Sequence, residues 1–169
     1  VETYRGDRNV LDTIITENEN EDPHIQNEDL SEENLSEGEK FSSSRAPKPV
    51  GAYPHARRVG DLLYLSGVGP RQPKSNAIPG GPVKDSTGKK LNYNMKAQTI
   101  ACIENVKTIL EDSGSSMEDI VDITSFLIDM DRDFEDYNTI YAEYFNEIQP
   151  TRTTLEISAL PTAIAVEMK

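Results

Sequence analysis

The sequence predicts an α+β domain over residues 46–169, in which a mixed β-sheet carries two helices packed on one face. Short runs rich in β-branched and aromatic residues are bounded by turn residues, as strands usually are. Two longer segments repeat apolar residues at helical spacing. These elements follow one another in the order ββ-loop-α-β-α-β-β, which is typical of helices that cover a mixed sheet.

The body opens with a predicted β-hairpin. Ala56 to Val59 and Leu62 to Ser66 flank Gly60-Asp61, and such a two-residue connection is a strong hairpin signal. Proline, glycine, lysine and aspartate dominate the stretch from Pro70 to Gly88, which predicts a long loop.

A first helix is expected from Met95 to about Asp112, with Gly114 as its stop signal. The apolar residues of this segment recur at helical spacing: Ala97, Ile100, Ile103, Val106 and Leu110. Ile120 to Leu127 then alternates well enough, and is β-branched enough, to predict a strand.

A second helix is expected with the acidic residues Asp131 to Asp133 in its first turn. It carries an apolar and aromatic stripe that we expect in the core: Phe134, Tyr137, Ile140, Tyr141, Tyr144, Phe145 and Ile148. Thr153 to Ile157 and Ala163 to Met168 are predicted as closing strands, and the last is expected to be truncated. Two helices leave part of the sheet uncovered, so we expect self-association.

Residues 1–45 differ from the body in composition. They carry 13 acidic and 4 basic residues, net -9, which leaves 17 acidic and 13 basic residues, net -4, for residues 46–169. This acidic leader has too little apolar surface to offset the entropy of ordering it, so we expect disorder. Within it, Val10 to Ile15 is compatible with a short helix or strand, and an interaction segment or the remnant of a preceding domain are the alternatives.

Composition also limits the function. The net charge of -13 argues against binding nucleic acid, which calls for basic patches. We expect no membrane association, because no apolar run approaches the roughly 18 residues of a spanning helix. Cys102 is the single cysteine, which favours a reducing compartment and hence a cytoplasmic protein. A zinc site is not expected, because His24, His55 and Cys102 have unsuitable spacings.

One arginine and one glutamate point to chemistry on a carboxylated substrate. Arg152 lies in the segment Pro150 to Thr154, and Glu167 follows about one strand later. A guanidinium holds a carboxylate through two parallel hydrogen bonds, while a carboxylate can move a proton or position water. The alternative is a surface arginine paired with an acid such as Glu156.

Several separated motifs make the body resemble the Rid (reactive intermediate deaminase, YjgF-like) family. They occur in order as APKPVGAY from Ala46, LYLSG from Leu63, YNTIY from Tyr137, PTR from Pro150, Leu160-Pro161 and Val166-Glu167. Three further segments are similar to the 2-aminomuconate deaminase branch: GAYPHARR from Gly51, GVGPRQP from Gly67 and IPGG from Ile78. The resemblance implies a trimeric, chorismate-mutase-like fold with sites between subunits, and cofactor-free hydrolysis of an enamine or imine to a keto acid and ammonia.

Residue roles follow from the same resemblance. Arg152 would hold the substrate carboxylate and Glu167 would activate water, while Tyr53 and Asn138 would donate hydrogen bonds. Tyr53 and Asn138 match family positions that line the cleft, with a packed aromatic and a helix-surface residue as the alternatives. Ser66 and Gly67, at the end of the hairpin strand, would offer a hydroxyl and close backbone approach, or form a plain strand terminus. Thr154 stands where many relatives have a cysteine, which excludes a thiolate role there. A dicarboxylate such as 2-aminomuconate needs a second anchor, for which the candidates are His55, Arg57, Arg58 and Arg71.

Three alternatives stay open. The first is a broad deaminase of small enamines or imines such as 2-aminoacrylate, 2-iminobutanoate and 2-iminopropanoate, which needs no second anchor. The second is a non-catalytic trimer that binds small carboxylates. Ribonuclease or translation-inhibitor activity, known for some members of the family, fits poorly with the acidic composition.

Overall fold

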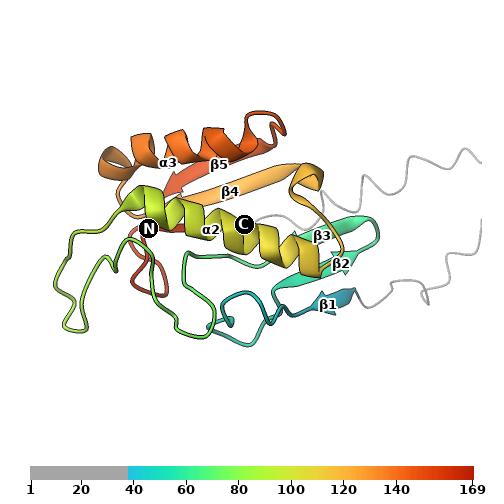
Figure 1. Ribbon diagram of the computed structural model, residues 1–169, viewed down its shortest axis with the longest axis horizontal. Coiled ribbons are helices and arrows are strands. Elements are labelled where there is room, and N and C mark those ends of the chain that lie inside the picture. Colours follow the sequence, from blue (N-terminus) through green and yellow to red (C-terminus); the bar gives the residue numbers. More distant parts are fainter. Residues whose placement is uncertain (1–37) are drawn as a thin grey trace, which may run out of the picture. The chain divides into compact units, whose positions relative to one another are not determined.

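The computed structural model describes residues 38–169 (Figure 1). The expectations for most of the acidic leader, including Val10 to Ile15, therefore lie outside the described residues. The elements are β1 (Glu39–Phe41), β2 (Ala56–Val59), β3 (Leu62–Leu65), α2 (Met95–Asp112), a 3-10 turn (Met117–Asp119), β4 (Asp122–Leu127), α3 (Met130–Phe145), β5 (Thr151–Glu156) and β6 (Val166–Met168).

The strands form two three-stranded sheets rather than one continuous sheet. β1, β2 and β3 make an antiparallel meander, whereas the second sheet has the order β5-β4-β6 and is mixed, with β4 parallel to β5 and antiparallel to β6. Val68 and Met168 join the sheets through reciprocal backbone hydrogen bonds of 2.8 and 2.9 Å. The sheets stay separate because no described strand lies between β3 and β4, where a hollow of about 400 Å³ is found instead.

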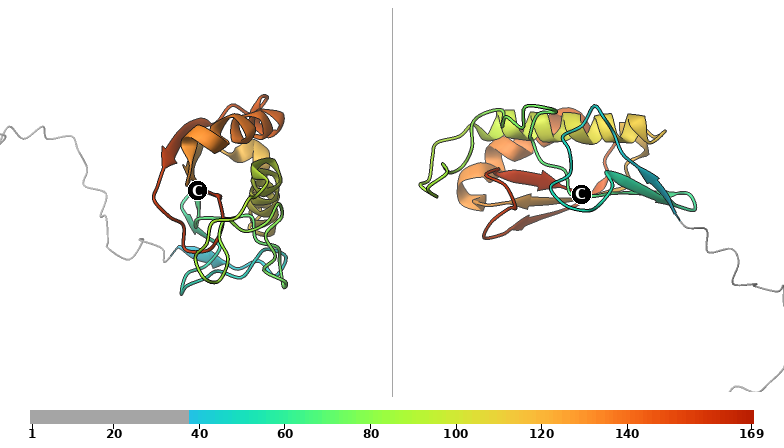
Figure 2. Two further views of the ribbon diagram at one scale, coloured as in Figure 1. Left: turned by 90° about the vertical axis from the view of Figure 1, so that its left-hand side faces the viewer. Right: turned by 90° about the horizontal axis from the view of Figure 1, so that it is seen from below.

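Both helices lie on the same side of the strands, as expected (Figure 2). The side chain of Asn94 caps α2 by accepting from the backbone N–H of Ala97, and Gly114 follows the helix with a positive φ of 73°. Asp129 caps α3 in the same way, by accepting from Arg132. The two predicted helices are confirmed. They could be predicted because apolar periodicity and capping residues, which are both local signals, define them.

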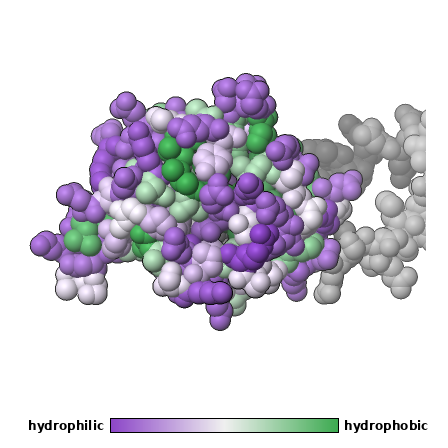
Figure 3. All heavy atoms as spheres, viewed as in Figure 1, coloured by the Kyte–Doolittle hydropathy of each residue, from purple (hydrophilic) through white to green (hydrophobic). Residues whose placement is uncertain are grey.

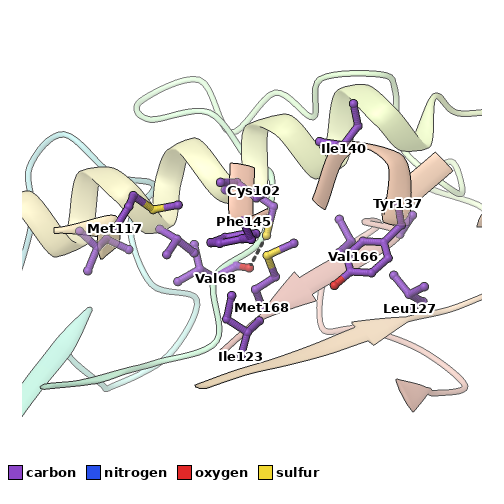
Figure 4. Close-up of a cluster of buried hydrophobic side chains, with 14 of the residues drawn as sticks. Val68, Cys102, Met117, Ile123, Leu127, Tyr137, Ile140, Phe145, Val166 and Met168 are labelled. Carbon is purple, nitrogen blue, oxygen red and sulfur yellow. Dashed lines mark hydrogen bonds between the residues drawn. The ribbon is translucent and has the colours of Figure 1, made fainter. Parts of the chain in front are cut away.

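The core lies between the helices and the second sheet (Figure 4). Ile103 of α2, Leu127 of β4 and Val166 of β6 are fully buried. Tyr137 is also fully buried and donates its hydroxyl to Ser125, so the aromatic stripe of α3 does contribute to the core. Cys102 is buried as well, with its thiol 3.0 Å from the carbonyl oxygen of Val68.

Several boundaries differ from the sequence expectation. Strand β3 ends at Leu65 rather than Ser66, and β4 begins at Asp122 rather than Ile120. Strand β1 lies within the segment assigned to the leader, where Lys40 pairs with Arg57 along the edge of the hairpin. After it, Arg45 contacts Asp112 at the end of α2 with a 2.6 Å ion pair. Strand β5 begins at Thr151 rather than Thr153, and β6 is limited to Val166–Met168. Pairing between distant segments sets these limits, and local composition does not record it.

The sheet face away from the helices carries exposed apolar side chains. Tyr64 and Leu62 are 54% and 53% exposed, and Leu155 of the second sheet is 44% exposed. Figure 3 shows the opposite side, where α2 lies, and that surface is largely hydrophilic with small hydrophobic areas. The exposed apolar side chains of the uncovered face define a surface for the expected self-association, which stays a prediction.

Candidate active site

Arg152 lies on the edge strand β5, under helix α3. It pairs with Ile123 of β4, which is buried, so its side chain is on the sheet face that the helices cover. Its guanidinium lies 4.5 Å from the centre of the Tyr141 ring, and Nη1 donates to Oδ1 of Asn138 at 2.9 Å. Two residues predicted for the site, Arg152 and Asn138, are therefore in contact, and the arginine is half-buried among aromatic rings.

Two buried hydroxyl groups beside Arg152 lack a hydrogen-bond partner within residues 38–169. They belong to Tyr141 and to Thr154, which lies two residues further along β5 on the same face. The Thr154 hydroxyl lies close enough to the Tyr137 hydroxyl to act on the pKa of Tyr137, so the Tyr141 hydroxyl is the more isolated of the two. A buried hydroxyl without a partner costs about 1–3 kcal/mol, so both groups suit a polar ligand. Burial raises the pKa of Tyr141 to about 12, which keeps its hydroxyl a donor at neutral pH. We call Arg152, Asn138, Tyr141 and Thr154 the arginine cluster.

Glu167 belongs to a second group of residues. It pairs with Phe126 of β4 and lines a hollow of about 490 Å³ together with Tyr53, Ser66 and Gly67. Burial raises the pKa of Glu167, and the positive charge of Arg71 acts in the opposite direction. A raised pKa makes a carboxylate a stronger base than a solvated one, which suits it to accept a proton from water. We call Glu167, Tyr53, Ser66 and Gly67 the glutamate cluster.

Gly67 leaves room for the glutamate side chain. A Cβ atom at position 67 would lie 2.9 Å from the carboxyl carbon of Glu167, so any larger residue would displace that carboxylate. The neighbouring Ser66 hydroxyl donates to the carbonyl oxygen of Pro54 at 2.7 Å. In this arrangement Gly67 positions Glu167, while the Ser66 hydroxyl is directed to the backbone.

The two clusters lie on opposite faces of the second sheet. Arg152 pairs with Ile123, and Glu167 pairs with Phe126, three residues further along β4. Because successive side chains of a strand alternate between faces, residues paired with positions 123 and 126 point in opposite directions. The structure thus unites Arg152 with Asn138 and Thr154, and Glu167 with Tyr53, but it separates Arg152 from Glu167 within one chain.

Three of the candidate cations for a second substrate carboxylate are engaged elsewhere. Nδ1 of His55 accepts from the backbone N–H of Ser43 and Nε2 donates to the carbonyl oxygen of Pro47, so both ring nitrogens hold the segment after β1. Arg71 donates from its two Nη atoms to Asn76 and to the backbone of residue 48. Arg58 donates to the carbonyl oxygen of Ser113 on the helix side of the sheet.

Two other kinds of feature are not found in the described residues. Within residues 38–169, no three His, Cys, Asp or Glu side chains are grouped closely enough to hold a metal ion. No helix in the described part of the chain is both long and apolar enough to cross a membrane.

Comparison with known proteins places the chain in a family. The family described as endoribonuclease L-PSP matches residues 43–169. The chain belongs to this family. A RutC family protein of Pyrococcus abyssi is 37% identical over 131 residues, which cover 78% of this chain and 93% of that protein. The "Reactive Intermediate Deaminase A, chloroplastic" of Arabidopsis thaliana is 33% identical over 131 residues, covering 78% and 63% of the two chains.

Solved structures agree with the family assignment. Two Escherichia coli proteins, TdcF with bound serine and the YjgF gene product, each give a TM-score of 0.65 at 28% identity, covering 77% of this chain and 94% of theirs. The resemblance to the Rid and YjgF family, and the α+β fold that it implies, are thereby confirmed. The finer resemblance to the 2-aminomuconate deaminase branch stays a prediction.

The compartment and the assembly also stay predictions. The family includes a mitochondrial protein of Saccharomyces cerevisiae, 30% identical over 128 residues, as well as the chloroplastic Arabidopsis protein. Family membership therefore does not select the cytoplasm.

Proposed function

We propose that this chain is a hydrolytic deaminase of enamine or imine carboxylates. The arginine cluster is the main support, because a half-buried guanidinium with two unpartnered buried hydroxyls beside it is suited to a carboxylate. Membership of a family that includes a protein named reactive intermediate deaminase gives independent support.

The reaction needs a clamp, a water molecule and a route for protons. Protonation of the enamine at carbon gives an iminium ion, water adds to its C=N carbon, and the resulting carbinolamine loses ammonia and leaves a ketone. The net change is enamine plus water to ketone plus ammonia. Arg152 would hold the carboxylate next to the reacting carbon, and Glu167 would accept a proton from the attacking water.

We place the complete site between two copies of the chain. The arginine and glutamate clusters lie on opposite faces of the second sheet, so one substrate cannot touch both in a single chain. In a closed, symmetric oligomer, the arginine cluster of one copy can face the glutamate cluster of the next. The exposed apolar side chains of the uncovered face, Leu62 and Tyr64 among them, favour such an assembly, for which we propose a homotrimer.

For the substrate we propose 2-aminomuconate, which would yield 2-oxohex-3-enedioate and ammonia. Support comes from the motifs around Gly51, Gly67 and Ile78 that resemble the corresponding deaminase branch. A broad deaminase of small monocarboxylic enamines is the second candidate, and the serine bound to the related TdcF favours it because serine carries a single carboxylate.

The test is to incubate the purified chain with freshly generated 2-aminomuconate and, separately, with 2-aminoacrylate. We expect ultraviolet absorbance of 2-aminomuconate to fall faster than without enzyme, with one ammonia released per substrate consumed. Faster turnover of 2-aminoacrylate alone would select the broad deaminase. Binding of carboxylates without ammonia release from either substrate would select a non-catalytic binding protein.

A further inference from the structure

The hollow beside Glu167 contains a cation to which the proposed reaction gives no role. Arg57 lines this hollow together with Glu167 and Tyr53. It lies on β2 and pairs with Tyr64 of β3, so both side chains are on the sheet face away from the helices. Within residues 38–169, no hydrogen bond or ion pair engages the Arg57 guanidinium, so none of the described residues occupies its donors.

Its availability distinguishes Arg57 from the other basic residues of the region. Arg58 donates from Nη2 to the carbonyl oxygen of Ser113 on the helix side, and both ring nitrogens of His55 contact the backbone. The charge of Arg71 acts on Glu167, but both of its Nη atoms already donate to an amide and a backbone oxygen. Lys169 also lines the hollow, but an ammonium group lacks the two-pronged geometry of a guanidinium. Lys40, which pairs with Arg57 across the hairpin, does not line it.

A second carboxylate at this end of the site needs such a cation. Glu167 already places a carboxylate in the hollow, and a dicarboxylic ligand would bring another next to it. Two like charges in a half-buried space repel each other, and a positive charge between or beside them offsets that repulsion. A guanidinium on the wall of the hollow satisfies this requirement and offers two parallel hydrogen bonds.

We propose that Arg57 binds the second, distal carboxylate of a dicarboxylic substrate and so sets the preference for dicarboxylic over monocarboxylic enamines. This inference rests on the proposed function for its role in turnover. The binding step itself, recognition of the distal carboxylate, is separate from catalysis and can be measured without it.

The experiment compares two unreactive ligands of equal carbon skeleton. Muconate and sorbate are both six-carbon dienes, with two carboxylates and one respectively, and neither carries an amino group to hydrolyse. Calorimetry on the wild-type oligomer should show tighter binding of muconate. Arg57→Ala should weaken muconate binding about tenfold to hundredfold, as expected for hydrogen bonds to a charged group, and leave sorbate binding within about twofold.

Matched variants make the result specific. Lys40→Ala removes a cation from the same face and the neighbouring strand, and should leave both affinities unchanged. Arg57→Lys keeps the charge and should recover only part of the muconate affinity. The inference is overturned if the wild type does not prefer muconate, if Arg57→Ala weakens both ligands equally or neither, or if Lys169→Ala removes the preference instead. Since no ammonia is measured, a failed deaminase assay leaves this test intact.

Discussion

At the scale of single residues, Arg152 is held in place on one side and lies beside buried hydroxyl groups on the other. Its guanidinium stacks on the Tyr141 ring and is held by Asn138, while the adjacent hydroxyls of Tyr141 and Thr154 have no partner within the described chain. The aromatic ring restrains the arginine without using its remaining donors. A carboxylate could bind these donors and both hydroxyls together.

Removing this guanidinium should therefore affect turnover far more than folding. We expect Arg152→Ala to lower kcat/KM by about a hundredfold or more, because two charge-assisted hydrogen bonds of about 1.5–3 kcal/mol each are lost. Arg152→Lys retains the charge without the two-pronged geometry and should recover little activity. Steady-state ammonia release measures the effect, with thermal unfolding of both variants as the control. Near-normal turnover of Arg152→Ala would remove the clamp from the mechanism.

Gly67 offers a test of how Glu167 is positioned. Gly67→Ala introduces a Cβ atom 2.9 Å from the Glu167 carboxyl carbon, so the carboxylate must move. We expect kcat to fall at least tenfold in steady-state assays, since a displacement of about 1 Å can cost on the order of a hundredfold. In a Glu167→Gln background the same substitution should have almost no further effect on kcat. Independent, additive losses would show that Gly67 acts by another route.

The raised pKa of Glu167 predicts a pH-dependent contribution to stability. Its carboxylate is penalised by burial in the folded chain, so the native state is favoured by protonated Glu167. Wild-type stability from this group is fully present below the unfolded pKa of about 4.3 and is lost as pH rises through the higher folded pKa. Glu167→Gln should therefore be more stable than wild type at pH 7 and equal to it near pH 3.5, in urea unfolding. A difference independent of pH would argue against this origin.

At the scale of elements, the first turn of α3 is tied to the long loop before α2. Tyr93 donates its hydroxyl to the buried carboxylate of Asp133 at 2.5 Å, and the Arg132 guanidinium stacks 3.6 Å from the centre of the Tyr93 ring. Burial raises the pKa of Asp133, and the hydrogen bond from Tyr93 opposes that rise. The position of α3, and with it that of Asn138 and Tyr141, thus depends on a residue in a loop.

Loss of this hydrogen bond should destabilise the fold measurably. We expect Tyr93→Phe to lower the free energy of unfolding by about 1–3 kcal/mol at pH 7, because the Asp133 carboxylate loses a buried donor. The loss should shrink at acidic pH, where the carboxyl group is protonated. Urea unfolding across pH measures both effects, with Tyr64→Phe on the exposed face as the control. An equal effect of the two substitutions would contradict the role of Asp133.

Elements defined by local signals could be predicted from the sequence, whereas elements defined by distant pairing could not. Asn94, Gly114 and the helical periodicity fix α2 locally, and Gly60-Asp61 fixes the β2–β3 hairpin. Strand β1 has the sequence EKF, which carries no strand signal, and it forms because β2 offers an open edge. The division into two sheets likewise depends on the hollow that separates β3 from β4, and no local sequence pattern records that hollow.

The candidate site follows the same division. Arg152 and Asn138, both named from the sequence, are in contact, and Tyr141 could have been added because it is three residues from Asn138 on one helix face. The opposite orientation of Glu167 could not be foreseen. It follows from the register of β5 and β6 on the two sides of β4, which no local pattern records.

At the scale of the whole molecule, the separation of the two clusters predicts that activity requires contact between copies. Arg152→Ala and Glu167→Gln chains should each be inactive as pure oligomers. Mixed oligomers would regenerate sites wherever an intact Arg152 of one copy meets an intact Glu167 of another. Random one-to-one mixing in a ring should restore about one quarter of the wild-type sites.

The measurement is ammonia release after the two variants are partly unfolded together and refolded, with mass spectrometry to confirm that mixed oligomers form. A mixture of Arg152→Ala with the double variant Arg152→Ala/Glu167→Gln is the control, and it should stay inactive because it contains no intact Arg152. Recovery of ammonia release in the first mixture alone would show that the site is completed between copies. The exposed apolar face around Tyr64 and Leu62 would then both bury surface and bring the arginine and glutamate clusters together. No recovery from confirmed mixed oligomers would mean that each chain must carry out the reaction alone, which the opposed orientations of Arg152 and Glu167 disfavour.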